Sequence, residues 1–204
     1  NSELRIFDDD SLYWTAIESL YIPSKVEEFE SCWCDNTALL NKINISPKNK
    51  KFMFFDGDFI VGKSDISSSV YDVLVLARRN IRTPIIPSFI KRIAPCAFNF
   101  CNKYNTVKFS KNSELEIIDE NAFSCSSLKR IKIPSSVKEI KNFAFDECFD
   151  FEIFEIEENS QLRSIECNAF NITQITSFVF PSYLSKVEPY SFSCRNMQII
   201  EISE

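Results

Sequence analysis

A repeat of 47 residues constrains this chain more than any other feature. Three stretches align without a gap at that spacing: IPSFIKRIAPCAFNFCNKYNTVKFSK from residue 86, IPSSVKEIKNFAFDECFDFEIFEIEE from residue 133 and FPSYLSKVEPYSFSCRNMQIIEISE from residue 180. The segments NSELEIIDENAF (112–123) and NSQLRSIECNAF (159–170) keep the same spacing, and the opening NSELRIFDDDSL is a third copy. A fixed period of this length is typical of solenoids, in which each repeat packs on its neighbours.

Each 47-residue repeat divides into two coils. A small residue followed by phenylalanine recurs with spacings of 25, 22, 25 and 22, at Phe98, Phe123, Phe145, Phe170 and Phe192. Apolar triplets of the form φxxφxφ, such as Leu128, Ile131 and Ile133, keep step with this series. The triplet is typical of the short strand of a leucine-rich repeat, whose period is about 20–29 residues. We therefore expect about eight short coils.

The alternation of side chains explains why such coils must stack. In a strand, Ile131 and Ile133 point into the solenoid while Lys132 points out. Because one coil cannot bury its own apolar side, we expect a continuous parallel sheet, packed from the opposite side by the phenylalanine series. The predicted fold class is an α/β or mainly β repeat solenoid, a leucine-rich repeat with short parallel strands on the concave face and a β-hairpin insertion.

The insertion lies between the strands that end at Ile45 and Ile86, where about 17 residues exceed a half-repeat. FMFF, Asp56-Gly57 and DFIVG predict a β-hairpin closed by a type I′ turn, and VYDVLVLA is a third extended run. We interpret the hairpin as a structural insertion that decorates one edge, and a functional protrusion is the alternative. Pro84 occupies the place of Ile131 in the next copy, which predicts an irregular sheet there.

These boundaries predict one leucine-rich repeat domain over residues 1–204. N-terminal coils occupy 1–45, the hairpin insertion 46–82 and regular coils 83–204. Because the chain opens inside a repeat, we expect a fragment of a longer array.

Composition argues against most enzymes. The chain has no histidine, the commonest general base near neutral pH, and its two glycines cannot form a phosphate-binding loop. The acidic run Asp8, Asp9 and Asp10 is expected to be a solvated turn, and the pairs Lys50-Lys51 and Arg78-Arg79 a solvated surface. We predict no catalytic residue, no metal site and no cofactor. A net charge of −6 argues against nucleic acid, and no apolar run approaches the length of a membrane span.

Eight cysteines raise the question of disulfides or a metal site. Cys101 and Cys148 lie 47 residues apart with Cys125 between them, which predicts a packed column. Cys32 and Cys34 form a CxC pair that aligns with Phe143 and Phe145 of a later repeat. Such a pair is a poor zinc site, and its alignment with phenylalanine indicates core positions. We expect free buried thiols and keep disulfides as the alternative.

The outward positions of the concave sheet are the extended surface available to a partner. The central positions are Tyr21, Asn44, Lys108, Lys132, Glu155, Val179 and Glu201, with Lys129, Arg130, Glu152, Ile153 and Ile199 beside them. This strip has a basic middle and an acidic, partly apolar C-terminal part, which suits a protein partner better than a polyanion. The alternative is that these are ordinary solvated strand residues.

The segments IPSSVKEIKNFAFDEC and NSELEIIDENAFSCSSLKRIKIP resemble the BspA-like leucine-rich repeat family of surface antigens and adhesins. The resemblance covers nearly the whole chain and implies a curved solenoid without catalytic residues. By analogy it implies a protein or cell-surface ligand and a cell-surface or secreted location. An intracellular, cytoplasmic scaffold that binds an endogenous protein is the alternative. The glycosylation sequons at Asn44 and Asn171 matter only on a secreted chain. The sequence leaves the oligomeric state open.

Overall fold

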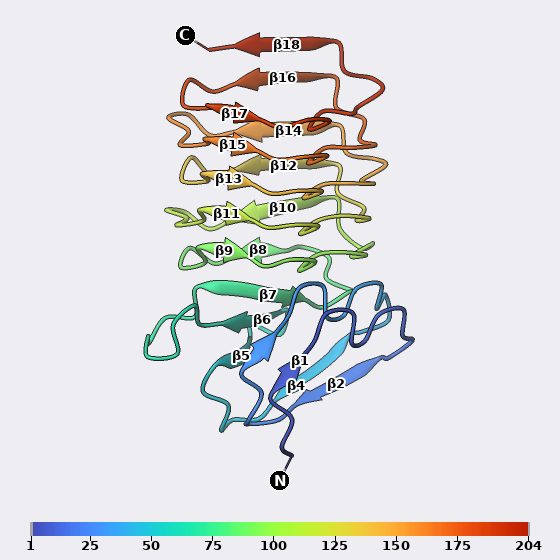
Figure 1. Cartoon of the computed structure of the whole chain (residues 1–204), viewed down its shortest axis with the longest axis vertical. Coiled ribbons are helices and arrows are strands. Elements are labelled where there is room, and N and C mark those ends of the chain that lie inside the picture. Colours follow the sequence, from blue (N-terminus) through green and yellow to red (C-terminus); the bar gives the residue numbers. More distant parts are fainter. Residues whose placement is uncertain (1, 204) are drawn as a thin grey trace.

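The computed structural model of the protein describes residues 2–203, which wind into a β-solenoid without a helix. Its rungs stack along one axis between the two chain ends (Figure 1). The solenoid has about nine turns, close to the number expected. The prediction of a mainly β repeat solenoid is therefore confirmed.

Each regular turn contributes a long strand and a short strand on opposite sides of the rung. The long strands are β2 (Ser19–Ile22), β4 (Lys42–Ile45), β8 (Ile85–Ile86), β10 (Thr106–Phe109), β12 (Arg130–Ile133), β14 (Ile153–Ile156), β16 (Ser177–Phe180) and β18 (Ile199–Ile202). The short strands are β1 (Ile6–Phe7), β3 (Glu28–Phe29), β9 (Arg92–Ile93), β11 (Ile117–Ile118), β13 (Glu139–Ile140), β15 (Ser164–Ile165) and β17 (Lys186–Val187). The irregularity predicted from Pro84 is confirmed, since β8 has only two residues.

The apolar triplets place their last two members in the long strands, as the alternation predicts. Ile131 and Ile133 are buried while Lys132 between them is exposed. The strands of successive turns pair in parallel, with Lys132 beside Glu155 and Ile131 beside Phe154. Each turn thereby buries the apolar side of its neighbours.

A column of phenylalanine rings fills the interior. Consecutive ring centroids lie 4.8, 5.3, 5.2 and 5.1 Å apart, with interplanar angles of 17°, 3°, 5° and 13°, along Phe98, Phe123, Phe145, Phe170 and Phe192. These distances match the spacing between neighbouring strands, about 4.8 Å. One ring per turn therefore packs on the next without disturbing the sheets.

Loops between the short and long strands also stack, although they contain no glycine. Two residues four apart adopt positive φ in these loops, for example Asn121 (54°) and Cys125 (54°). This conformation costs an ordinary residue about 1–2 kcal/mol. Hydrogen bonds between turns offset part of that cost, since the Phe123 amide donates to Ala144 at 2.8 Å and the Phe145 amide to Ala169 at 2.8 Å.

The hairpin insertion is part of the solenoid. Its strands are β5 (Phe52–Phe55), β6 (Phe59–Gly62) and β7 (Val73–Ala77), and the turn has positive φ at Asp56 and Gly57, as a type I′ turn requires. The hairpin prediction is confirmed, and the hairpin forms one end of the short-strand sheet. β7 pairs in parallel with β9, and the short-strand sheet continues through β7 and β6 to β5.

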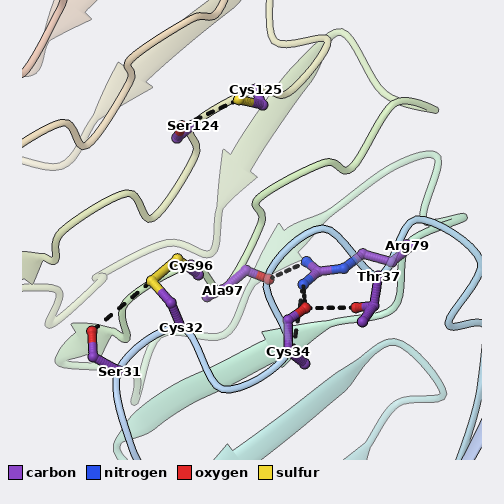
Figure 2. The surroundings of a disulfide bond; sticks show 9 residues. All are labelled: Ser31, Cys32, Cys34, Thr37, Arg79, Cys96, Ala97, Ser124 and Cys125. Carbon is purple, nitrogen blue, oxygen red and sulfur yellow. Dashed lines mark hydrogen bonds between the residues drawn. A yellow bond between two sulfur atoms is a disulfide. The ribbon is translucent and has the colours of Figure 1, made fainter. Parts of the chain in front are cut away.

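This insertion brings two distant loops together. The connection from β7 to β8 spans only residues 78–84 and has no residue with positive φ, unlike the loops on either side of it. The loops that begin at Cys32 (φ 51°) and Cys96 (φ 56°) therefore become neighbours, and a disulfide joins these two equivalent positions across 64 residues (Figure 2). The expectation that all cysteines are free thiols is wrong for this pair.

Arg79 fills the space left by the short connection. Its side chain is fully buried, and its guanidinium donates to the carbonyls of Cys34 at 3.4 Å and Ala97 at 3.3 Å (Figure 2). It thus ties together the same two turns that the disulfide joins. The expectation of a solvated Arg78-Arg79 pair is wrong for Arg79, because the two loops enclose its guanidinium and their carbonyls accept its hydrogen bonds.

The long strands do not form the continuous sheet that the repeat predicts. They divide into β2–β4, β8–β10–β12–β14 and β16–β18. β12 and β14 pair at four positions, as do β16 and β18, whereas no pairing joins β14 to β16 in the described residues. The solenoid is therefore built of double coils with weaker junctions between them.

Proline removes one hydrogen bond at each junction between double coils, although β10 and β12 still pair at two positions. The first long strand of each double coil is followed by Pro23, Pro87, Pro134 or Pro181, which have no amide hydrogen. The second strand closes its end with an amide that donates to the first, as Glu157 does to Ile133 at 3.0 Å and Ser203 to Phe180 at 2.9 Å. The same bond cannot form from a proline to the preceding double coil.

Replacing Phe145 with alanine should lower the free energy of unfolding by about 3–5 kcal/mol, because its ring packs between Phe123 and Phe170. Phe149→Ala is the matched control, since this ring is 59% exposed and its loss should change stability by less than about 0.5 kcal/mol. Urea denaturation followed by circular dichroism measures both. A loss below about 1 kcal/mol at Phe145 would contradict the ring column.

Replacing both Cys32 and Cys96 with serine should lower the free energy of unfolding by about 2–4 kcal/mol, because the bond restricts the unfolded chain across the insertion. Dithiothreitol should destabilise the wild type by a similar amount and leave the double variant unchanged. Cys167→Ser, at a half-buried free thiol, serves as the control. Equal stability of oxidised and reduced wild type would show that the bond is not formed.

Candidate functional site

The long-strand face, defined as the outward side chains of the long strands, carries the predicted binding residues. All of them are exposed: Tyr21, Asn44, Lys108, Lys129, Arg130, Lys132, Glu152, Ile153, Glu155, Val179, Ile199 and Glu201. Alternation places the residues within the strands there, because the residue that follows an outward position turns into the core, whereas Lys129 and Glu152 immediately precede β12 and β14. Their role in binding stays a prediction.

The structure brings only part of this set together. Lys108, Arg130, Lys132, Ile153 and Glu155 share the four-stranded sheet of β8, β10, β12 and β14. Tyr21 and Asn44 lie on the separate β2–β4 sheet, on the far side of the insertion. Val179, Ile199 and Glu201 lie on the β16–β18 sheet, beyond the unpaired junction.

Strand register arranges the central residues in rows. Arg130 stands between Thr106 and Ile153 in one row, and Lys132 stands beside Glu155 in the next. Lys108 pairs with Ile85 on its other side. Since Val107 pairs with Ile131, the following residues Lys108 and Lys132 are also neighbours. Three cations thus occupy adjacent positions on β10 and β12.

A shallow hollow of about 370 Å³ lies over these rows, and we call it the basic depression. It is lined by Thr106, Val107, Lys108, Phe109, Arg130, Ile131, Lys132, Ile153, Glu155 and Glu157. Within residues 2–203, Lys108, Arg130 and Lys132 take part in no ion pair, whereas nearby Lys129 lies 3.6 Å from Asp150. Sequence reasoning missed two features, the register of the strands and the basic depression. The alternation of side chains within a strand does not determine which strands pair.

A larger groove of about 880 Å³ lies at the junction between β14 and β16. Glu155 and Val179 border it on the long-strand face, and the turns at 157–161 and 181–183 form its side. The core rings of Phe154 and Phe178, which stack at 5.4 Å, also line the groove.

The free thiols belong to the packing of the core. Cys101 and Cys148 are fully buried in one column, as predicted, but Ser126 rather than Cys125 stands between them. The Cys148 thiol donates to the Phe123 carbonyl at 3.0 Å. Burial raises the pKa of the Cys148 thiol to about 12 and that of Cys34 to about 11. A thiol that stays protonated at neutral pH is a poor nucleophile and a poor metal ligand.

Other charged groups from the sequence do not converge on a site. Asp8, Asp9 and Asp10 are exposed in a turn, as expected, and Lys50 is exposed while Lys51 is half-buried. In residues 2–203 no group of three or more cysteine, aspartate or glutamate side chains is placed to hold a metal ion. Within the same residues no helix could cross a membrane.

The two sequons differ in exposure. Asn44 projects from β4 on the long-strand face. The Asn171 amide donates to Asp146 at 2.8 Å, and Thr173 of the same sequon is buried. Only Asn44 offers an exposed side chain without such a contact.

Comparison with known proteins identifies the repeat. The family model of the BspA type leucine rich repeat region matches residues 1–55 and 75–198 in six copies. The chain belongs to this family. The resemblance drawn from the sequence is confirmed. Residues 56–74 of this BspA-type repeat protein belong to the insertion and lie outside the match. No curated protein matches the chain.

Solved structures share the fold. A leucine rich cell surface protein from Faecalibacterium prausnitzii superimposes with a TM-score of 0.81 at 21% identity, over 98% of this chain and 52% of that one. A leucine-rich repeat protein from Eubacterium ventriosum gives a TM-score of 0.73 at 16% identity, over 91% and 49%. The pneumococcal vaccine antigen PcpA gives 0.53 at 13% identity, over 100% and 55%. The BspA-type repeat chain thus spans about half the length of these proteins.

The thiol column predicts a pH dependence of stability. An unfolded thiol ionises near pH 9.0, but folded Cys148 keeps its proton to about pH 12. The folded state therefore binds more protons in this window, and stability falls as pH rises through it, by up to about 1.4 kcal/mol per pH unit. Relative to wild type, Cys148→Ser should remove the part of the slope that Cys148 contributes, while the other buried thiols keep theirs.

Urea denaturation at a series of pH values from about 7 to 10.5 measures the difference between the two proteins. The difference in free energy of unfolding between wild type and Cys148→Ser should be constant below about pH 8 and change above about pH 9. Ser126→Ala, in the same column but without a thiol, should leave the slope unchanged. Parallel curves for wild type and Cys148→Ser would show that the thiol is not protected from ionisation.

Proposed function

We propose that this chain is a non-enzymatic, protein-binding solenoid module that presents its long-strand face to a partner. The observation that carries the proposal is the cluster of three exposed cations, Lys108, Arg130 and Lys132, without an ion pair over the basic depression. Inward positions of the same strands are fixed by packing, so the outward positions are where recognition can vary. The absence of histidine from the sequence adds support for a non-enzymatic role.

The module acts at a cell surface or outside the cell, in adhesion or another host interaction. Two structural neighbours are described as a cell surface protein and a vaccine antigen, and they share the fold with this chain. The Cys32–Cys96 disulfide favours an oxidising compartment. The domain organisation proposed for this role is one repeat domain over 1–204, with the insertion at 46–82 between N-terminal and regular coils.

An intracellular scaffold is the second candidate. Six of the eight cysteines are free thiols, which is the pattern of a reducing compartment. Such a scaffold would use the same long-strand face for an endogenous protein. Binding of the labelled chain to intact cells, compared with permeabilised cells, separates the two candidates: surface binding supports the first and binding only after permeabilisation supports the second.

Charge reversal tests the face itself. Proteins retained by the immobilised chain from a surface-protein extract are identified, purified singly and measured for affinity. Lys108→Glu, Arg130→Glu and Lys132→Glu together should weaken binding by about tenfold or more, because close opposite charges across an interface contribute strongly to affinity. Circular dichroism of this variant should match that of wild type, since the three side chains are exposed.

The matched control reverses Lys48, Lys50 and Arg195. These side chains are also exposed, outside the long strands and without an ion pair in the described chain. This variant has the same net charge as the face variant and should bind within about twofold of wild type. Equal affinity of wild type, face variant and control would count against the long-strand face.

A further inference from the structure

The basic depression has a charge pattern that specifies its partner. We propose that it docks an acidic protein segment in which two carboxylates are flanked by an apolar side chain on one side and a cation on the other. This inference rests on the proposed function and names the chemistry of the partner.

The three cations lie close enough together to repel one another. Lys108 and Lys132 are neighbours across β10 and β12, and Arg130 lies on the same face two residues before Lys132. Like charges directly opposite each other on a sheet are destabilising. No carboxylate in the described residues forms an ion pair with any of the three, although the whole chain has a net charge of −6. An anionic partner would relieve this repulsion.

The border of the depression is not basic. Ile85 (53% exposed) lies beside Lys108 on β8, and Ile153 (37% exposed) lies beside Arg130 on β14. Glu155 follows Lys132 in the same row, and Glu157 also lines the depression. Across the strands the row thus runs apolar, basic, basic, acidic. The complementary segment presents an apolar, an acidic, an acidic and a basic side chain in that order.

A sulfated glycan matches this pattern less well. A polyanion long enough to continue along the stack would meet Glu152, Glu155 and Glu157, which repel it. It would also leave Ile85 and Ile153 uncovered, whereas an apolar side chain of a protein segment would remove their apolar surface from water. The volume of about 370 Å³ lies at the lower end of the range of ligand pockets, which suits a few side chains of a protein segment.

The test uses defined peptides. The probe is the fluorescein-labelled peptide Leu-Ser-Glu-Ser-Glu-Ser-Lys, whose alternate side chains share one face in an extended conformation. Its control analogue has glutamine in place of both glutamates and so lacks the two carboxylates. Fluorescence polarisation on the whole chain should show the acidic peptide binding at least about fivefold more tightly than the analogue, with the difference shrinking as salt rises.

A charge swap makes the assignment specific. Lys108→Glu with Lys132→Glu should abolish the preference for the acidic peptide and create one for Leu-Ser-Lys-Ser-Lys-Ser-Lys, whose last lysine still complements the unchanged Glu155. The control variant, Lys48→Glu with Lys50→Glu, has the same net charge and should keep the wild-type preference. A loss of binding through misfolding would not produce the reversed preference, so the swap remains informative even if the variant is less stable.

Several results would overturn the inference. Equal affinity for the acidic peptide and its glutamine analogue would do so, and so would tighter binding of a heparin-derived oligosaccharide that does not depend on Ile85 and Ile153. The two proposals fail separately. If a purified partner requires the three cations but the acidic peptide neither binds nor competes, the proposed face stands and its acidic specificity is wrong; if the partner ignores the cations, the face itself is wrong.

Discussion

The packing of each turn on its neighbours is the constraint on which the rest of the structure depends. A single turn has no second layer of its own, so Phe145 is buried only because Phe123 and Phe170 lie above and below it, 5.3 and 5.2 Å away. Ring spacing and strand spacing must agree, and both are close to 4.8 Å. Each turn must therefore repeat the inward residues of its neighbour, while its outward residues stay free to vary. Lys108, Lys132, Glu155 and Val179 occupy equivalent outward positions and differ in charge and polarity.

Features that follow from this periodicity could be predicted from the sequence. The pattern of inward and outward side chains within a single turn predicts the long strands, the phenylalanine column and the exposure of the face residues. The disulfide could not be predicted in this way, because Cys32 and Cys96 are 64 residues apart, a distance that matches no multiple of the repeat. Their contact depends on the short connection at 78–84, whose effect appears only when the turns are stacked.

Arg79 and the insertion show a second limit. A pair of arginines in a loop is usually solvated, whereas the buried Arg79 guanidinium donates to carbonyls of two neighbouring turns, a placement that depends on how the turns stack. The hairpin strands were evident from the turn residues Asp56 and Gly57, but a sequence does not state which strand pairs with β9. Shorter pairing between double coils could have been inferred from the prolines, since Pro134 and Pro181 remove donors at fixed places. Where the sheet divides could not, because β10 and β12 pair across the Pro134 junction while β14 and β16 do not pair across the Pro181 junction.

This division confines the candidate site. The insertion ends the long-strand ladder before β8, and the proline junction ends it after β14, so these four strands form the largest long-strand sheet. The three unpaired cations lie inside it, and the acidic residues Glu155 and Glu157 lie at its C-terminal border. At physiological salt, charges are screened beyond about 8 Å. A short acidic segment within the sheet therefore experiences the local cations more strongly than the net negative charge of the chain, whereas a long polyanion must also cross the acidic border. The same hydrogen-bonding pattern that sets the limits of the sheet thus also limits the length of ligand that its charges favour.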